Sequence, residues 1–299
     1  MKNETSDQQG VTKVAIQGIS GSFHEIAACK YFKNNNIPIL ECYTFEETID
    51  SLIKGLVDFA IMAIENTVAG SLLQNYTLLR ESQVRIVGEE YLRIKQNLMA
   101  LPGQKIEEIV EVQSHYMAIN QSRSFFKQFP RIKLVESYDT ALSAREILEK
   151  GIKGRGAIAG ELAASRYNLE ILAEGIETNK KNYTRFLVLA RGKSGNQNNL
   201  SEVYQQFTKS SLCFSLPHKK GSLAKVLAIL ARNDLNLTKI QSMPVIGKEF
   251  TYFFYVDVIF GNYKKYLKSL HEVSQYALEV IILGEYAGNP ESMKAINNI

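Results

Sequence analysis

Cysteine is scarce in this 299-residue sequence, and its three cysteines, Cys29, Cys42 and Cys213, form no CxxC pair. An odd number of cysteines without metal-type spacing argues against a disulfide framework and favours reduced thiols in a cytoplasm. The four histidines also lack the spacing of metal ligands. We therefore expect neither a metal nor another bound cofactor.

Long apolar runs and charge blocks are missing as well. No run approaches the roughly 18 apolar residues that span a bilayer, and residues 1–10 are polar, unlike the core of a signal peptide. The formal net charge is only +4, without a dense block of Lys and Arg. This pattern argues against a nucleic-acid partner. The expectation is a cytoplasmic protein that binds neither membranes nor nucleic acid.

The composition that remains is that of a globular protein, with 45% hydrophobic and 22% charged residues. The length suits two or three compact units. The clearest break is the Gly-, Ser- and Asn-rich stretch at 192–201. It predicts a linker over about 192–209 between a large unit at 11–191 and a small unit at 210–287.

The large unit reads as an α/β sheet protein, because short apolar runs alternate with helical periodicity. Helices are expected after several of the strands, starting at the cap residues Ser22, Ser71, Ser114 and either Asp139 or Thr140. Helices that begin at the ends of neighbouring strands bring free N–H groups to one edge of the sheet, which predicts an anion-binding cleft. The alternative is that each cap merely completes its own helix. The expected strands are Val14–Gln17, Phe59–Ile64, Val110–Gln113, Lys133–Tyr138, Ala157–Ala159 and Tyr183–Ala190.

The small unit reads as strand, helix, strand, strand, helix, strand, which is the order of a ferredoxin-like βαββαβ fold. Its open sheet has unpaired edges, so we expect two copies to associate as a homodimer or within a homotetramer. The expected strands are Ser211–Leu216, Leu237–Val245, Phe250–Val258 and Leu278–Leu283.

No common catalytic motif stands out. Gly154–Ala159 fits the GxGxxG/A pattern of a dinucleotide site, but it precedes its strand instead of following one. A phosphate-binding GxxxxGK[ST] loop and a nucleophile elbow do not occur. From composition and spacing alone, the chain is a two-lobed α/β protein with an anion-binding cleft and an appended module.

The residues at the strand–helix junctions resemble the motifs of the prephenate dehydratase family, in the right order and spacing. Gly18–Ala27 resembles its Gly-rich opening motif, and Ala63–Ser71 resembles its Pro-Ile-Glu-Asn-Ser…Gly-Ser segment, with Ala for Pro and Thr for Ser. Ser114–His115 matches its Ser-His pair, and Asn182–Phe186 is similar to its Thr-Arg-Phe signature. In the small unit, Gly221–Leu223 stands where ACT domains have Gly-Ala-Leu.

This resemblance implies a two-lobed catalytic unit, hinged like a periplasmic binding protein, followed by an ACT regulatory domain. Lobe one would hold about 11–85 and 179–191, lobe two about 86–178, and the active site would lie between them. No chorismate mutase helices precede the match, so the chain looks monofunctional. The implied reaction converts prephenate to phenylpyruvate, water and carbon dioxide in phenylalanine synthesis. Arogenate dehydratase and a non-catalytic small-molecule sensor stay open as alternatives.

The resemblance also implies roles for single residues. Thr184 is expected to donate to the departing hydroxyl, assisted by Glu65 and Asn66. Strand periodicity places Thr184 on one face and Arg185 on the other, so Arg185 reaches the cleft only if the strand bends or ends there. Without the motif, Thr184 is an ordinary β-branched strand residue. The expected substrate contacts are Ser20, Gly21, Ser22, Thr67, Ser71, Ser114, His115, Arg185 and Phe186.

L-Phenylalanine is the effector that the resemblance implies, bound at a dimer interface of the ACT domain. The first expected segment is Gly221, Ser222 and Leu223, where glycine allows close backbone approach. The second is Gln241, Ser242, Met243 and Pro244. The family has Glu-Ser-Arg-Pro in this second segment. Gln241 replaces the Glu and Met243 replaces the Arg, so the charged pair is absent from this sequence.

Overall fold

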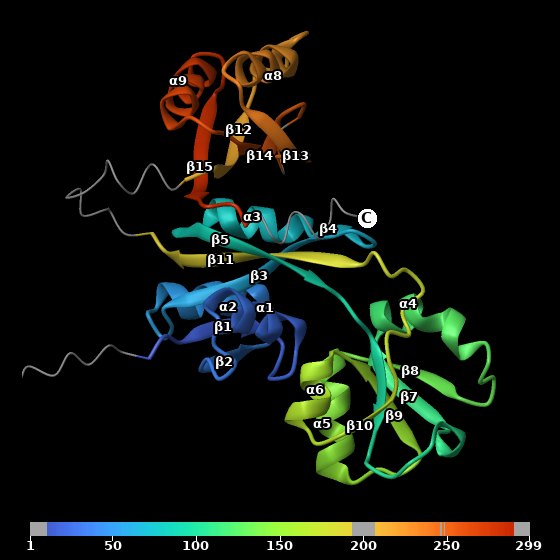
Figure 1. Cartoon of the computed structure of the whole chain (residues 1–299). Helices are drawn as coiled ribbons and strands as arrows, with labels where there is room; N and C mark the ends of the chain where they lie inside the picture. The colour runs from blue at the N-terminus through green and yellow to red at the C-terminus, as the bar shows by residue number, and fades with distance from the viewer. Residues whose placement is uncertain (1–10, 193–206, 246, 248, 290–299) are drawn as a thin grey trace, which may run out of the picture.

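The structure, a computed structural model, describes residues 11–192, 207–245, 247 and 249–289. It contains a large ten-stranded sheet and a separate five-stranded sheet (Figure 1). All the strands predicted above are present, with ends that differ by up to three residues. The predicted linker lies largely at 193–206, outside the described residues, and β12 already begins at Lys209.

The first lobe is built on the large sheet. Parallel β1 lies between β2 and β3, and its residues Val14, Ala15 and Ile16 are fully buried, as expected for a central parallel strand. The strands are β1 (Val14–Gln17), β2 (Ile39–Cys42), β3 (Phe59–Asn66), β4 (Gly70–Ser71), β5 (Val84–Arg93) and β11 (Tyr183–Arg191). The helices are α1 (Phe23–Phe32), α2 (Phe45–Ile53) and α3 (Leu73–Glu81).

The second lobe is built on the smaller sheet, in which β7 pairs with β8 and β9 in parallel. Its strands are β6 (Asn97–Ala100), β7 (Glu111–His115), β8 (Lys133–Ser137), β9 (Arg155–Ala159) and β10 (Glu170–Ala173). Its helices are α4 (Tyr116–Phe126), α5 (Thr140–Lys150) and α6 (Glu161–Arg166), with a 3-10 turn at Ile106–Glu108. The chain crosses between the sheets twice, after β5 and before β11.

The boundary between the lobes differs from the expected one near residue 86. Strand β5 pairs with β11 along its whole length, from Val84 opposite Arg191 to Arg93 opposite Tyr183. Residues 86–93 therefore belong to the first lobe. The partner strand lies about a hundred residues later in the sequence, so the local pattern around residue 86 carries no sign of this pairing.

Two of the four predicted helix caps are confirmed. The Ser22 hydroxyl accepts a hydrogen bond from the Glu25 amide at the start of α1, at 3.4 Å. The Asp139 carboxylate accepts from the Leu142 amide at the start of α5, at 2.9 Å.

The other two predicted caps are wrong. Helix α3 begins at Leu73, because Ser71 instead forms a β-pair with Glu65 in the short strand β4. Helix α4 is capped by the His115 ring, which accepts from the Met117 amide at 3.4 Å. Ser114 is fully buried at the end of β7 and donates to the Ile158 carbonyl at 2.6 Å.

The C-terminal unit has the predicted βαββαβ order. Its elements are β12 (Lys209–Ser215), α8 (Ser222–Arg232), β13 (Asn236–Pro244), β14 (Tyr252–Ile259), α9 (Tyr263–Ser274) and β15 (Glu279–Tyr286). The antiparallel strands lie in the order β13-β14-β12-β15. Helices α8 and α9 cover one face, and the other face packs on α3, where Tyr76 contacts Tyr255 with ring centroids 5.1 Å apart (Figure 1).

This unit also extends the large sheet, which the sequence did not predict. Strand β15 pairs with β5 through Gly284 and Ile86. A Cβ atom on Gly284 would lie 2.2 Å from the Ile86 carbonyl oxygen, so only glycine permits this approach. The C-terminal unit therefore docks at a fixed place on the first lobe.

Within the described residues, the helices are too short or too polar to cross a membrane. Cys29, Cys42 and Cys213 are buried free thiols. The same residues contain no cluster of His, Cys, Asp and Glu that could hold a metal ion.

Candidate active site

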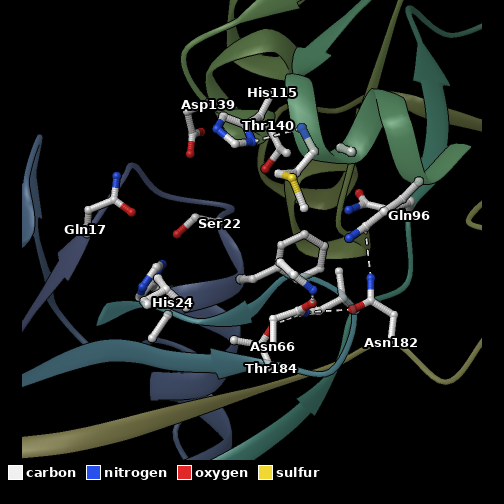
Figure 2. A pocket seen from close by; sticks show the side chains of 18 of the residues that line it. Gln17, Ser22, His24, Asn66, Gln96, His115, Asp139, Thr140, Asn182 and Thr184 are labelled. Atoms are coloured by element: carbon white, nitrogen blue, oxygen red, sulfur yellow. Dashed lines mark hydrogen bonds between the residues drawn. The ribbon is translucent and has the colours of Figure 1, made fainter. Parts of the chain in front are cut away.

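A cavity of about 520 Å³ lies between the two lobes. Figure 2 shows that Ser22, Asn66 and Thr184 of the first lobe and His115 and Asp139 of the second lobe surround the same space. The volume suits a small organic molecule. Its lining residues include Gln17, Ser22, Phe23, His24, Asn66, Ser71, Gln96, His115, Gln121, Asp139, Thr140, Asn182, Thr184 and Phe186.

Four helices begin at this cavity, as the anion-cleft hypothesis requires. The starts of α1, α4 and α5 bring Ser22, His115 and Asp139 into its wall, and Leu72 precedes α3. The first N–H groups of a helix carry a partial positive charge and bind anions. Among the described lining residues there is no Lys or Arg. A negatively charged ligand would therefore be attracted here by helix starts and neutral donors.

Asn66 makes the Thr184 hydroxyl a hydrogen-bond acceptor toward the protein and leaves it a donor toward the cavity. The Asn66 side-chain oxygen accepts from the amides of Val68 and Ala69, at 2.9 and 2.8 Å. Its nitrogen must therefore face the other way, where it donates to Thr184 Oγ1 at 2.9 Å. Because Thr184 Oγ1 already accepts this hydrogen bond, its own hydrogen is free to be donated into the cavity.

Asn182 and Gln121 extend this arrangement to the second lobe. Asn66 Nδ2 also donates to Asn182 Oδ1 at 2.7 Å, and Asn182 Nδ2 donates to Gln121 Oε1 at 2.9 Å. Gln121 lies on α4, whereas the other members belong to β3 and the start of β11. The chain of amides links the position of the second lobe to the orientation of Thr184 (Figure 2).

His24 is a neutral member of the cavity wall. Its ring packs against Phe186 and Phe45, with centroids 5.0 and 5.6 Å away. The buried Nε2 has no hydrogen-bond partner among the described residues. Burial lowers the pKa of His24 to about 3, so the imidazole stays uncharged at physiological pH.

This depressed pKa predicts acid-sensitive stability. Below the ordinary histidine pKa, the unfolded chain binds a proton at His24 that the folded protein excludes, so the free energy of unfolding falls by about 1.4 kcal/mol per pH unit. In His24→Gln, the loss between pH 7 and pH 5 should be smaller by about 2 kcal/mol. Urea unfolding at both pH values measures this, with His271→Gln on the exposed face of α9 as the control. An equal loss in wild type and His24→Gln contradicts the prediction.

His115 and Asp139 form the titratable wall of the second lobe. Burial lowers the pKa of His115, although the carboxylates of Asp139 and Glu136 act in the opposite direction. Burial raises the pKa of Asp139, although amide donors from α5 and the His115 ring oppose the rise. Each group is therefore shifted toward its neutral form, which suits a wall that faces an anion.

The cavity wall includes six residues that the sequence proposed as site residues: the catalytic candidates Asn66 and Thr184, and the substrate-contact candidates Ser22, Ser71, His115 and Phe186. Phe186 is 1% exposed and packs in the core of the first lobe. Others take structural roles. The Ser20 hydroxyl and the Gly21 amide donate to Glu25, at 3.0 and 2.5 Å.

Glu65, Thr67 and Ser114 also lie outside the lining. The Thr67 hydroxyl donates to the Lys181 carbonyl at 2.8 Å, and the Ser114 hydroxyl faces the interior of the second lobe. Glu65 pairs with Lys239 of the C-terminal unit, at 3.0 Å. Thr67 and Ser114 thus bond to the backbone, and Glu65 pairs with another side chain, in place of contacts to a ligand in the cavity.

The placement of Arg185 in the cleft is wrong. Strand β11 stays extended, so Arg185 points to the face opposite Thr184, where it is 4% exposed. It bonds to Glu89 at 2.8 Å, to Tyr286 at 3.0 Å and to Asp257. Arg185 therefore joins the catalytic sheet to the C-terminal unit.

Several lining residues were missed at the sequence level: His24, Gln17, Gln96, Gln121 and Asn182. His24 and Asn182 lie inside two of the motifs that carry the family resemblance, Gly18–Ala27 and Asn182–Phe186. Their place in these motifs could have identified them as site residues. The three glutamines come from β1, the segment before β6 and the middle of α4. Nothing in their local sequence distinguishes them from surface amides.

The fold and the cavity define a two-lobed α/β protein with a cavity for a small molecule between its lobes. The family model for prephenate dehydratase matches residues 14–194. This match covers more than half of the chain, and the chain belongs to the prephenate dehydratase family.

The chain is also similar to several proteins of known name. The chain is 36% identical over 260 residues to arogenate dehydratase/prephenate dehydratase 1, chloroplastic, of Arabidopsis thaliana, a match that covers 82% of this chain and 64% of that protein. A solved structure described as a novel type of quorum quenching acylase, GqqA, is 29% identical, with a TM-score of 0.82 over 93% of this chain and 99% of its own. Prephenate dehydratase of Arthrobacter aurescens in complex with L-Phe is 24% identical, with a TM-score of 0.79 over 96% of both chains, and shares the fold.

Proposed function

We propose that this protein converts prephenate to phenylpyruvate, water and carbon dioxide in the synthesis of phenylalanine. The observation that carries the proposal is the Thr184 hydroxyl in the cavity wall, which accepts a hydrogen bond from Asn66 and so keeps its own hydrogen available to a ligand. Family membership supports the same reaction class. The lobes would close on the substrate like those of a periplasmic binding protein.

The site suits the substrate because prephenate is a small dianion with a ring hydroxyl. Its two carboxylates match the helix starts of the two lobes, without a fixed cation among the described lining residues. Such preorganised N–H groups and dipoles replace the water that solvates the carboxylates. The separation of the helix starts across the cavity orients the ring relative to Thr184.

In this reaction the protein has to assist one step, the departure of the ring hydroxyl. The ring hydroxyl leaves with a proton as water, the bond between the ring and its carboxylate breaks to release carbon dioxide, and that electron pair enters the ring. Aromatisation supplies the driving force, and the protein stabilises the developing charge on the departing oxygen. Thr184 donates a hydrogen bond to this oxygen. Because a hydroxyl is a weak acid, the transferred proton comes ultimately from solvent.

Incubation of the purified protein with prephenate tests the proposal. The expected product is phenylpyruvate, together with one equivalent of carbon dioxide. A parallel assay with arogenate, which carries an amino group in place of the keto oxygen, determines the substrate preference. Binding of prephenate without turnover of either compound would identify a non-catalytic sensor instead.

The acylase named for the GqqA structure is not the function that this cavity favours. An acylase requires a nucleophile activated by a nearby base. In the described cavity wall, neither His24 nor His115 bonds to a serine or threonine hydroxyl. The Thr184 hydroxyl instead accepts a hydrogen bond from the Asn66 amide, which does not increase its nucleophilicity.

We further propose that the C-terminal unit is an ACT domain that binds L-phenylalanine. A small apolar cavity lies at the start of α8, where an amino-acid carboxylate would meet free helix N–H groups beside aromatic rings. Gly221 precedes this helix with a φ of 81°, and Ser222 and Leu223 line the cavity. Gln241, Ser242, Met243 and Pro244 lie on the neighbouring edge strand β13. In a dimer or tetramer, that edge would complete the site.

L-Phenylalanine should bind at millimolar concentration or tighter, with its ring in the apolar part of the cavity. Isothermal titration with L-phenylalanine, and with L-serine as the control without a ring, measures the expected difference. Prephenate turnover is followed in the same titration. If L-phenylalanine neither binds nor inhibits at millimolar concentration, the regulatory proposal is wrong.

A further inference from the structure

Lys239 reaches from the C-terminal unit into the first lobe. Its side chain on β13 is 9% exposed, and its ammonium lies 5.5 Å from the centre of the Tyr76 ring on α3. The ammonium pairs with Glu65 at 3.0 Å and donates to the Ser71 hydroxyl at 2.9 Å. A cation with three partners across a domain boundary has one defined position.

The partners of Lys239 enclose a functional turn. Glu65 and Ser71 face each other across β3 and β4, and Asn66 faces Gly70. These pairs form a hairpin whose tip, residues 67–69, is folded around the Asn66 side chain. The ammonium bridges the two strands next to Asn66. The orientation of Asn66, and through it that of Thr184, depends on this hairpin.

Ser71 gives Lys239 a second effect on the cavity. Ser71 lines the cavity, and its oxygen accepts a hydrogen bond from the Lys239 ammonium. The hydroxyl hydrogen of Ser71 is therefore free to be donated toward a ligand. Lys239 thus places a positive charge one hydroxyl away from a cavity whose described wall contains no Lys or Arg.

We propose that Lys239 is a positioning residue for catalysis: it fixes the hairpin at 65–71 so that Asn66 and Ser71 present their donors correctly. The inference rests on the proposed function. It also makes the C-terminal unit part of the catalytic machinery, because β13 supplies this lysine. Since residues 241–244 follow Lys239 on the same strand, a ligand that shifts β13 would change turnover through Lys239.

The test compares Lys239→Met with two matched variants. Methionine keeps the apolar stem over Tyr76 and removes the charge, so kcat for prephenate should fall by about tenfold or more, with a smaller change in KM. Lys239→Arg should keep kcat within about threefold, because it restores a cation at this place. Lys225→Met is the control, since Lys225 lies over the Tyr276 ring in the same unit but far from the hairpin.

A double variant separates positioning from general stability. In an Asn66→Ala background, Lys239→Met should lower kcat by a smaller factor than in the wild-type background, because the effect through Asn66 is already gone and only the effect through Ser71 remains. Equal losses in both backgrounds, or wild-type kcat in folded Lys239→Met, would overturn the proposal. If Lys239→Met does not fold, Lys239→Gln is tested in the same two backgrounds. Wild-type protein without turnover would instead refute the proposed function.

Discussion

Thr184→Val should lower kcat for prephenate by about 10²–10³-fold, the loss typical when one preorganised donor is removed. Valine has the shape of threonine without the hydroxyl, so the strand and the cavity keep their form. Asn66 Nδ2 retains its bond to Asn182, at 2.7 Å, so no buried donor is left alone. Binding of prephenate should change by less than about threefold, since the proposal assigns its carboxylates to the helix starts and not to Thr184.

Phenylpyruvate formation and equilibrium binding of prephenate, measured on the same protein, test this expectation. Thr184→Ser is the matched control, because it keeps the hydroxyl and should retain most of the activity. Asn66→Asp is the second comparison. An aspartate oxygen would accept a hydrogen bond from the Thr184 hydroxyl, which could then no longer donate to the substrate. The value of kcat should therefore fall although the Thr184 hydroxyl is still present. Turnover by Thr184→Val at the wild-type rate would show that Thr184 is not the donor.

Arg185→Met should destabilise the folded protein by about 3–5 kcal/mol, because it breaks a buried ion-pair network. Arg185 and Lys209 balance the carboxylates of Glu89 and Asp257, and all four side chains are at most 7% exposed. Methionine fills much of the space but leaves one buried negative charge without compensation. Because the four residues come from β11, β12, β5 and β14, the loss also weakens the contact between the two units.

The shift in the urea unfolding midpoint measures this effect. Arg191→Met, an exposed arginine on the same strand, should change stability by no more than about 0.5 kcal/mol. The double variant Arg185→Met with Asp257→Asn restores the charge balance and should be more stable than Arg185→Met alone. If Arg185→Met unfolds at the wild-type midpoint, the cluster contributes nothing to stability.

Acid should weaken the same cluster in the wild-type protein. Burial by itself raises the pKa of Asp257, but Arg185, Lys209 and the Ser211 hydroxyl outweigh it and hold the pKa below the ordinary value. A carboxyl group with a depressed pKa contributes stability that is complete above its unfolded pKa and is lost as the pH falls through its folded pKa. The contribution of Asp257 is therefore complete at neutral pH and disappears in strong acid.

The sequence by itself determined the features that depend on neighbouring residues. Strand β1 and the start of α1 could be predicted, because an apolar run, a Gly turn and the Ser22 cap follow one another directly. Period two along β11 placed Thr184 and Arg185 on opposite faces, as the structure has them. The same rule implied that Arg185 would reach the cleft only if the strand bent or ended there, and the strand does neither.

Only the tertiary structure decided the features that join distant segments. Such features are the pairing of β5 with β11, the bond of Ser114 to the Ile158 carbonyl that takes it away from the start of α4, and the contacts of Arg185 and Lys239 with residues of another unit. All of them bridge long separations in sequence. The physical reason is that a polar side chain takes the partner that the packed fold brings within hydrogen-bonding distance. Local periodicity fixes which way such a side chain points, whereas the packing of the sheets fixes what it meets.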